Sequence, residues 1–284
     1  MLPSATELLF ALGAGDDVVG VTFECDYPPE ARTRRIVSTS ALPEGLPPGE
    51  IDRVVSERMA AGEDLYRLDA GALRDLDADL VVTQDLCAVC AVDVSVVDEA
   101  LAYLGCRAQV LTLDPHTLDE VIGSVVTLGE AVGRTTEAAA LTGSLRDRLD
   151  RVVPAGSTRA LVLEWTDPPF APGHWVPDMV TSAGGVPVLG MGGEKSYRVD
   201  WAEVGGCDAE VVVVAPCGFG LADSARLGRE VLDRLPPGVP MWAVDANASF
   251  ARPGPRLVDG VEALAAIMRG DEPDPAIAAR LTAP

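Results

Sequence analysis

The stretch Leu80-Val-Val-Thr-Gln-Asp-Leu-Cys-Ala-Val-Cys90 is an apolar run of strand length, followed at once by a polar loop with a Cys-x-x-Cys pair. The same order, an apolar run and then a cysteine, returns in Val18-Val-Gly-Val-Thr-Phe-Glu-Cys25 and in Val211-Val-Val-Val-Ala-Pro-Cys217. Ligands of parallel α/β sheets bind beyond the carboxyl ends of the strands. The three loops therefore predict thiols from three strands directed at one cleft.

The elements expected around these loops fall into two similar halves. In the first half, helical periodicity and stop signals predict helices at residues 4–12, 51–61, 69–76 and 95–104, with strands at 18–22, 36–37, 80–83 and 109–113. The second half restarts with strands at 160–164, 211–215 and 241–244 and helices at 176–183, 222–235 and 257–268. Strands separated by helices indicate parallel sheets.

The longest helical pattern lies between the halves. It runs from about Thr117 to Val153 and ends at the breaker cluster Pro154-Ala-Gly-Ser157. We therefore expect an α/β protein of two Rossmann-like lobes with parallel sheets, joined by one long interlobe helix, with a ligand cleft between the lobes. The expected boundaries are 1–115 for the N-terminal lobe, 116–154 for the connecting helix and 155–284 for the C-terminal lobe.

Composition limits the partners and the compartment. The 284 residues carry 44 acidic against 22 basic side chains, a net charge of -22, which argues against nucleic acid because phosphates require basic patches. No run approaches the roughly 18 apolar residues of a membrane span. The sequence opens without a basic region followed by an apolar one, so we expect a cytoplasmic protein, with a trimmed exported protein as the alternative.

Aromatic residues, only 5% of the chain, gather after the strands of the second half. Apolar, aromatic clefts with a few polar groups are typical of small-molecule sites. Some of these rings have the alternative of packing in the core. The predicted ligand-binding residues, with the polar residues of the same loops, are Phe23, Glu24, Gln84, Asp85, Glu164, Trp165, Phe170, His174, Trp175, Lys195, Phe219, Trp242, Asp245 and Phe250.

The chain has only two histidines. His174 lies among the aromatic residues and is the better candidate for an axial metal ligand or a hydrogen-bonding group, with neutral packing as the alternative. His116, at the entrance to the long helix, is expected to be a surface or capping residue.

Four of the six cysteines fall on the predicted crevice, namely Cys25, Cys87, Cys90 and Cys217. Four thiolates suit zinc or an iron–sulfur cluster, and a Cys-x-x-Cys pair also suits dithiol redox chemistry. Thiols that only border a pocket are the third alternative. In a reducing compartment structural disulfides are the least expected use.

Several of these motifs resemble one protein family. Leu2-Pro-Ser-Ala-Thr-Glu-Leu-Leu-Phe-Ala-Leu-Gly13 with Val19-Gly-Val-Thr22 resembles the opening of the helical-backbone, or class III, periplasmic binding proteins, particularly the vitamin B12-binding component of ABC importers. The stretches at 83–90, 164–170 and 208–219 look like a branch usually labelled cobalamin-binding. The resemblance implies two α/β lobes bridged by one helix, with the ligand held between them.

The resemblance has two departures. Family members usually begin with a strand of the type Arg-Ile-Val-Ser-Leu before the Pro-Ser-Ala-Thr-Glu stretch, and this sequence starts at Met1 and Leu2. The absent export signal weakens the importer role. In addition, a corrinoid needs only a broad apolar face and one axial ligand. The four cysteine thiols are more than corrinoid binding requires.

The sequence thus predicts a protein that binds a cobalamin-type corrinoid or another metal chelate, and favours binding over catalysis. The first alternative is a metalloprotein or metalloenzyme with an iron–sulfur cluster or zinc on the four cysteines. A thiol–disulfide oxidoreductase is the second alternative. The expected partners are the small-molecule ligand and, less strongly, an ABC transporter permease.

Overall fold

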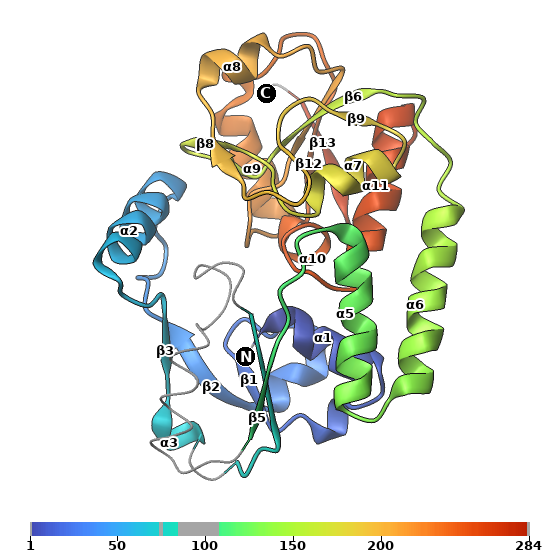
Figure 1. Cartoon of the computed structure of the whole chain (residues 1–284). Coiled ribbons are helices and arrows are strands. Elements are labelled where there is room, and N and C mark those ends of the chain that lie inside the picture. Colours follow the sequence, from blue (N-terminus) through green and yellow to red (C-terminus); the bar gives the residue numbers. More distant parts are fainter. Residues whose placement is uncertain (1, 74–75, 85–107, 283–284) are drawn as a thin grey trace. The chain divides into compact units, whose positions relative to one another are not determined.

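A computed structural model describes residues 2–73, 76–84 and 108–282. The chain divides into two compact units (Figure 1). Unit 1 comprises Met1–Pro115 with Gly123–Thr142, and unit 2 comprises His116–Ile122 with Gly143–Pro284. Within the described residues, no helix combines the length and apolar character that a membrane crossing requires.

Unit 1 consists of short strands with helices between them. Its elements are α1 (Pro3–Ala11), β1 (Gly20–Thr22), β2 (Arg35–Ser40), α2 (Pro48–Ala61), β3 (Tyr66–Leu68), α3 (Ala70–Leu73), β4 (Leu80–Thr83) and β5 (Gln109–Thr112). Strand β2 pairs in parallel with β1 and antiparallel with β3, and β4 pairs in parallel with β5. The predicted helix at 95–104 lies outside the described residues.

The segment between the predicted lobes is helical, but it is two helices and not one. Helix α5 (Leu118–Ala131) ends before Gly133, whose φ of 67° is left-handed, and α6 (Thr135–Asp150) follows after Arg134. The Arg134 N–H donates to the Gly129 carbonyl at 2.7 Å, which closes the end of α5. The apolar periodicity continues through the break, so the sequence pattern alone predicted a single helix.

Unit 2 is built on a five-stranded sheet in the order β13-β12-β11-β6-β9. Its strands are β6 (Arg159–Leu163), β7 (Trp165–Thr166), β8 (Pro169–Ala171), β9 (Val186–Pro187), β10 (Tyr197–Arg198), β11 (Val211–Val214), β12 (Met241–Val244) and β13 (Ala278–Leu281). Its helices are α7 (Val176–Ser182), α8 (Trp201–Gly206), α9 (Leu221–Glu230), α10 (Ala246–Ser249) and α11 (Leu257–Arg269). The sheet has a parallel centre, as predicted, and β13 adds an antiparallel edge.

The two faces of this sheet are covered by different helices. Alternate residues of the strands, such as Leu161, Val212 and Ala243, pack with Ala225 of α9 in one buried cluster. Figure 1 shows α9 on one side of the sheet and α7 with α11 on the other. Burial on both faces explains why β11 is a continuous run of valines. It also leaves the carboxyl ends of the strands as the place for functional side chains.

Candidate functional site

In unit 2, three predicted site residues follow neighbouring parallel strands. Glu164 follows β6, Cys217 lies just beyond β11 and Asp245 follows β12, and these strands are adjacent in the sheet. The Cys217 N–H donates to the Glu164 carbonyl at 3.1 Å, which joins the first two loops. All three side chains are half-buried. The Asp245 carboxylate is occupied as the N-cap of α10, where it accepts from the Ala248 N–H at 2.9 Å.

The same strand ends carry a pair of aromatic rings. Trp165 and Phe219 lie with ring centroids 5.6 Å apart at an angle of 49°, and both are half-buried. The Trp165 indole N–H donates to the Asp167 carbonyl at 3.0 Å, and the Phe219 carbonyl accepts from the Asn247 N–H at 3.0 Å. These bonds fix the backbones that present the pair. The pair is therefore an apolar, partly accessible surface in the loops that follow β6 and β11.

Three other predicted aromatic residues belong to the core. Trp175, Trp242 and Phe250 are only 5%, 5% and 2% exposed. The Trp175 indole N–H donates to the Phe250 carbonyl at 2.7 Å, so its one polar atom is satisfied internally. Burial gives these rings packing roles, the alternative that the sequence left open, and we leave them out of the proposed binding surface.

The remaining predicted residues of unit 2 lie around the β7–β8 hairpin and the loop before β10. Phe170 is half-buried, with the Arg198 guanidinium 5.7 Å from its ring centroid. Lys195 is exposed in the loop 192–196. That loop is attached to His174, whose N–H donates to the Glu194 carbonyl at 2.6 Å.

His174 and His116 lie together in unit 2. Their ring centroids are 6.0 Å apart, and the Trp175 ring is 5.6 Å from that of His174. The sequence predicted a functional role for His174 and only a surface or capping position for His116. No periodicity links the two positions, so the proximity of the rings could come only from the structure.

In unit 1, the residues after β1 form a second polar and aromatic group. The Tyr66 hydroxyl donates to the Glu24 carboxylate at 3.2 Å, and the Phe23 and Tyr66 rings are 6.2 Å apart. Phe23 is 39% exposed, which leaves its ring accessible. Tyr66 was missed because β3 was not predicted; its signal was the apolar alternation in Leu65-Tyr-Arg-Leu68.

Gln84 stands at the end of β4 and is 2% exposed. Neither atom of its side-chain amide has a hydrogen-bond partner among the residues that the structure describes. Within the described part of the chain, the buried hydroxyl groups of Thr22 and Ser38, at paired positions of β1 and β2, are also without partners. Buried polar groups are ordinarily satisfied, so these are positions where a ligand or water can supply hydrogen bonds.

The structure places two of the four cysteines. Cys25 is buried beside Val18 and Val21, with its Sγ 3.0 Å from Thr6 Oγ1, and Cys217 is half-buried in unit 2. Cys87 and Cys90, like Asp85, lie outside the described residues. Among the residues that the structure describes, no three or more His, Cys, Asp or Glu side chains group as a metal site.

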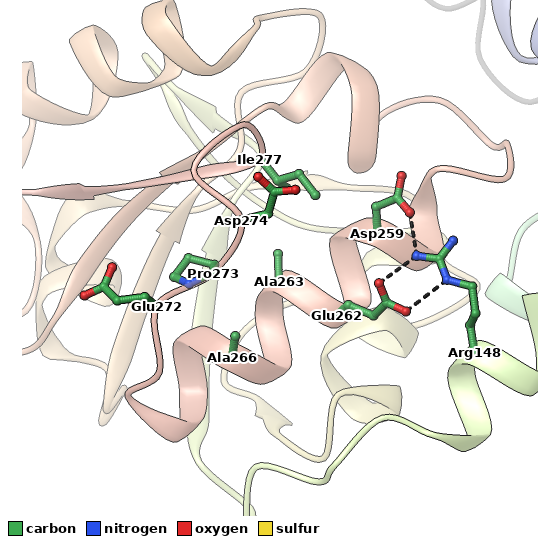
Figure 2. A pocket seen from close by; sticks show the side chains of 9 residues that line it. All are labelled: Arg148, Asp259, Glu262, Ala263, Ala266, Glu272, Pro273, Asp274 and Ile277. Carbon is green, nitrogen blue, oxygen red and sulfur yellow. Dashed lines mark hydrogen bonds and ion pairs between the residues drawn. The ribbon is translucent and has the colours of Figure 1, made fainter.

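A separate hollow of about 570 Å³ lies between α6, α11 and the loop 272–277 of unit 2 (Figure 2). Figure 2 shows Arg148 reaching Asp259 and Glu262, at 2.6 Å for each ion pair. These hydrogen bonds, with Glu262 first, raise the pKa of the Arg148 guanidinium. The lining also includes Glu272 and Asp274, so the hollow is strongly acidic, and none of the predicted site residues lines it.

This chain is similar in structure to several solved binding proteins. No family model and no curated protein sequence matches this chain. A periplasmic haem-binding protein from Pseudomonas aeruginosa superposes with a TM-score of 0.70 at 18% identity, covering 99% of this chain and 93% of that one. The periplasmic vitamin B12-binding protein BtuF of Vibrio cholerae gives 0.61 at 19% identity, covering 95% and 94%. An ABC transporter substrate-binding protein from Listeria monocytogenes gives 0.60 at 14% identity, covering 93% and 96%.

These matches overturn the predicted compartment. We expected a cytoplasmic protein, but the haem-binding and vitamin B12-binding structures that share this fold over almost their full length are periplasmic proteins. The way the sequence opens was the wrong basis for that prediction. The fold prediction, in contrast, is confirmed: the chain has the two-lobed α/β fold of the class III periplasmic binding proteins.

Proposed function

We propose that this chain is an exported binding protein for a tetrapyrrole-type metal chelate, with a cobalamin-type corrinoid as the first ligand and haem as the second. The fold supports a binding role, because structures that share it bind haem or vitamin B12. An ABC transporter permease is the proposed partner, by analogy with the substrate-binding protein of Listeria. The iron–sulfur or zinc alternative gains no support from the described residues.

The observation that carries the proposal is the Trp165–Phe219 pair. A corrinoid or porphyrin presents a wide, flat, apolar face, and two tilted rings at the carboxyl ends of β6 and β11 offer a matching surface. Glu164, the residue before Trp165, is half-buried and is the proposed polar contact of this surface. In unit 1, Phe23, Glu24 and the unsatisfied amide of Gln84 are the proposed contacts.

The test is a titration of the purified chain with hydroxocobalamin and, separately, with hemin. We expect saturable changes in the visible spectrum of at least one ligand. Removal of the ring in Trp165→Ala removes about 1.5–3 kcal/mol of apolar burial, which raises Kd by about ten- to a hundredfold.

Tyr197→Ala is the matched control. Tyr197 is an aromatic residue of the same unit, 44% exposed and outside the proposed surface, so its removal should leave Kd unchanged. No saturation with either ligand at high micromolar concentration would refute the proposed function. Equal affinity of wild type and Trp165→Ala would refute the proposed surface alone.

A further inference from the structure

The fold brings together the two histidines that this sequence contains. Each one stands two residues before a helix: His116 before α5, whose first residues belong to unit 2, and His174 before α7. Both side chains are half-buried, and their ring centroids are 6.0 Å apart with an interplanar angle of 50°.

His174 is held in an uncommon backbone conformation. Its φ of 51° lies in the left-handed region, which non-glycine residues rarely adopt. Two backbone hydrogen bonds keep it there, from its N–H to the Glu194 carbonyl and from the Gly193 N–H to its own carbonyl at 2.9 Å. Gly173 lies so close to the backbone of Ser196 that any larger residue would have to displace it. Strain of this kind persists only where surrounding contacts impose it, and it often marks a functional position.

His116 is fixed by the start of α5. The Glu120 carboxylate accepts from the His116 N–H at 2.6 Å and from the Thr117 N–H at 3.1 Å, while Thr117 Oγ1 accepts from the Glu120 N–H at 3.3 Å. This arrangement is a capping box. The Leu118 N–H donates to the Asp178 carboxylate of α7 at 3.1 Å, so one carboxylate ties the two histidine-bearing segments together.

We propose that His116 and His174 form a two-histidine anchor for a transition-metal centre. A metal–nitrogen bond of about 2.0–2.1 Å places a metal about 3.2 Å from the centre of an imidazole ring. Two such arms reach about 6.4 Å together, which exceeds the 6.0 Å between the ring centroids, so one metal ion can contact both rings when a nitrogen of each is turned toward it. Copper(II), nickel(II), cobalt and iron all accept imidazole nitrogen.

Carboxylates accompany the two helix starts, and the chain as a whole is acidic. Two helix starts contribute partial positive charge, which the Glu120 and Asp178 carboxylates offset, and the whole chain carries a net charge of -22. Because the described residues supply no third ligand in a metal-binding group, the other positions fall to water or to the donor atoms of a chelate. The metal therefore binds either as a hydrated ion, the ion case, or as part of a chelate, the chelate case. Only the chelate case rests on the proposed function.

The ion case is tested with copper(II) on the full chain, by calorimetry and electron paramagnetic resonance. We expect one site whose spectrum shows coupling to two imidazole nitrogens. His116→Gln and His174→Asn should each raise Kd at least tenfold; Asn suits this position because it tolerates left-handed backbone. Met191→Leu, an exposed change in the same loop region, should bind like wild type. Urea unfolding confirms that each variant is folded. A wild-type spectrum without nitrogen coupling, or unchanged Kd in both histidine variants, overturns the proposal.

The chelate case is tested with hemin against metal-free protoporphyrin. A direct bond to iron predicts a shifted Soret band and weaker hemin binding in His174→Asn, with no change in protoporphyrin binding. Identical hemin spectra in wild type and variant would exclude the bond while leaving the proposed function intact. If the wild type binds no tetrapyrrole, the proposed function fails, and the copper titration still decides the histidine site.

Discussion

One methyl group at Gly173 would test how firmly the loop beside His174 is held. A Cβ at this position would overlap Ser196 N and lie 2.5 Å from both the Glu194 oxygen and the Lys195 carbonyl carbon. All three are backbone atoms, so Gly173→Ala has to displace the loop 194–196. Overpacking of this kind destabilises the folded state by about 1–3 kcal/mol. Replacing Gly by Ala also lowers the entropy of the unfolded chain, which stabilises the folded state by about 0.4–1 kcal/mol. We expect a net loss of about 1–2 kcal/mol in the free energy of unfolding.

Urea unfolding followed by tryptophan fluorescence measures this loss in the relevant unit. All four tryptophans, Trp165, Trp175, Trp201 and Trp242, belong to unit 2. With a urea dependence of about 2 kcal/mol per molar, the midpoint should fall by about 0.5–1 M.

The matched control is Gly143→Ala in α6, where the added Cβ meets nothing within 4 Å. It should raise the free energy of unfolding by up to about 1 kcal/mol, because Ala favours helix over Gly. A Gly173→Ala midpoint at or above that of wild type would show that the loop yields without cost, and the argument that it constrains His174 would fail.

Two further changes test the electrostatics of unit 2. Arg148→Met removes the ion pairs to Asp259 and Glu262 and leaves these carboxylates unopposed; since all three groups are partly exposed, we expect a loss of about 1 kcal/mol, smaller at high salt than at low salt in urea unfolding. The pKa of Glu120 is lowered, chiefly by the hydrogen bond from the His116 N–H, so its contribution is present above the ordinary carboxyl pKa and is lost as pH falls through the lowered value. Glu120→Ala should therefore be less stable than wild type near neutral pH, and the difference in their free energies of unfolding should become smaller in acid. Urea unfolding at a series of pH values measures this difference, and a difference that does not change with pH would contradict the linkage.

The helices and strands that were predicted well are those specified by one continuous sequence pattern. Strand β12 was predicted with its observed ends, and α11 to within one residue, because an apolar run or an apolar stripe is enough to specify each. Strands β3, β7, β8, β9, β10 and β13 were missed. They are two to four residues long, and all but β9 pair antiparallel, so their formation depends on partners rather than on a pattern of their own.

The position of the aromatic residues after strands predicted where they lie in the fold. It did not predict which rings are accessible to a ligand and which are buried in the core. Trp165 and Phe219 are half-buried, whereas Trp242 is buried, although both tryptophans were assigned to the binding surface. The distinction was partly visible, because Trp242 falls inside a strand whose neighbours are apolar, and Trp165 follows one. Phe250 follows α10, a helix that the sequence did not predict, so its burial could not be anticipated.

The meeting of His116 and His174 follows from how two helix starts are satisfied. The first N–H groups of a helix have no partner within it, and Leu118 is the first residue of α5. Its N–H is satisfied by Asp178, which lies in the first turn of α7. One carboxylate therefore serves the start of one helix from the first turn of another, and the residues that precede both helices are drawn to the same place. The capping box at residues 117–120 could be read from the sequence, but the Asp178 bond could not, because it joins segments far apart in the chain. The histidine pair is thus a consequence of helix capping, and whatever moves Asp178 should move both rings.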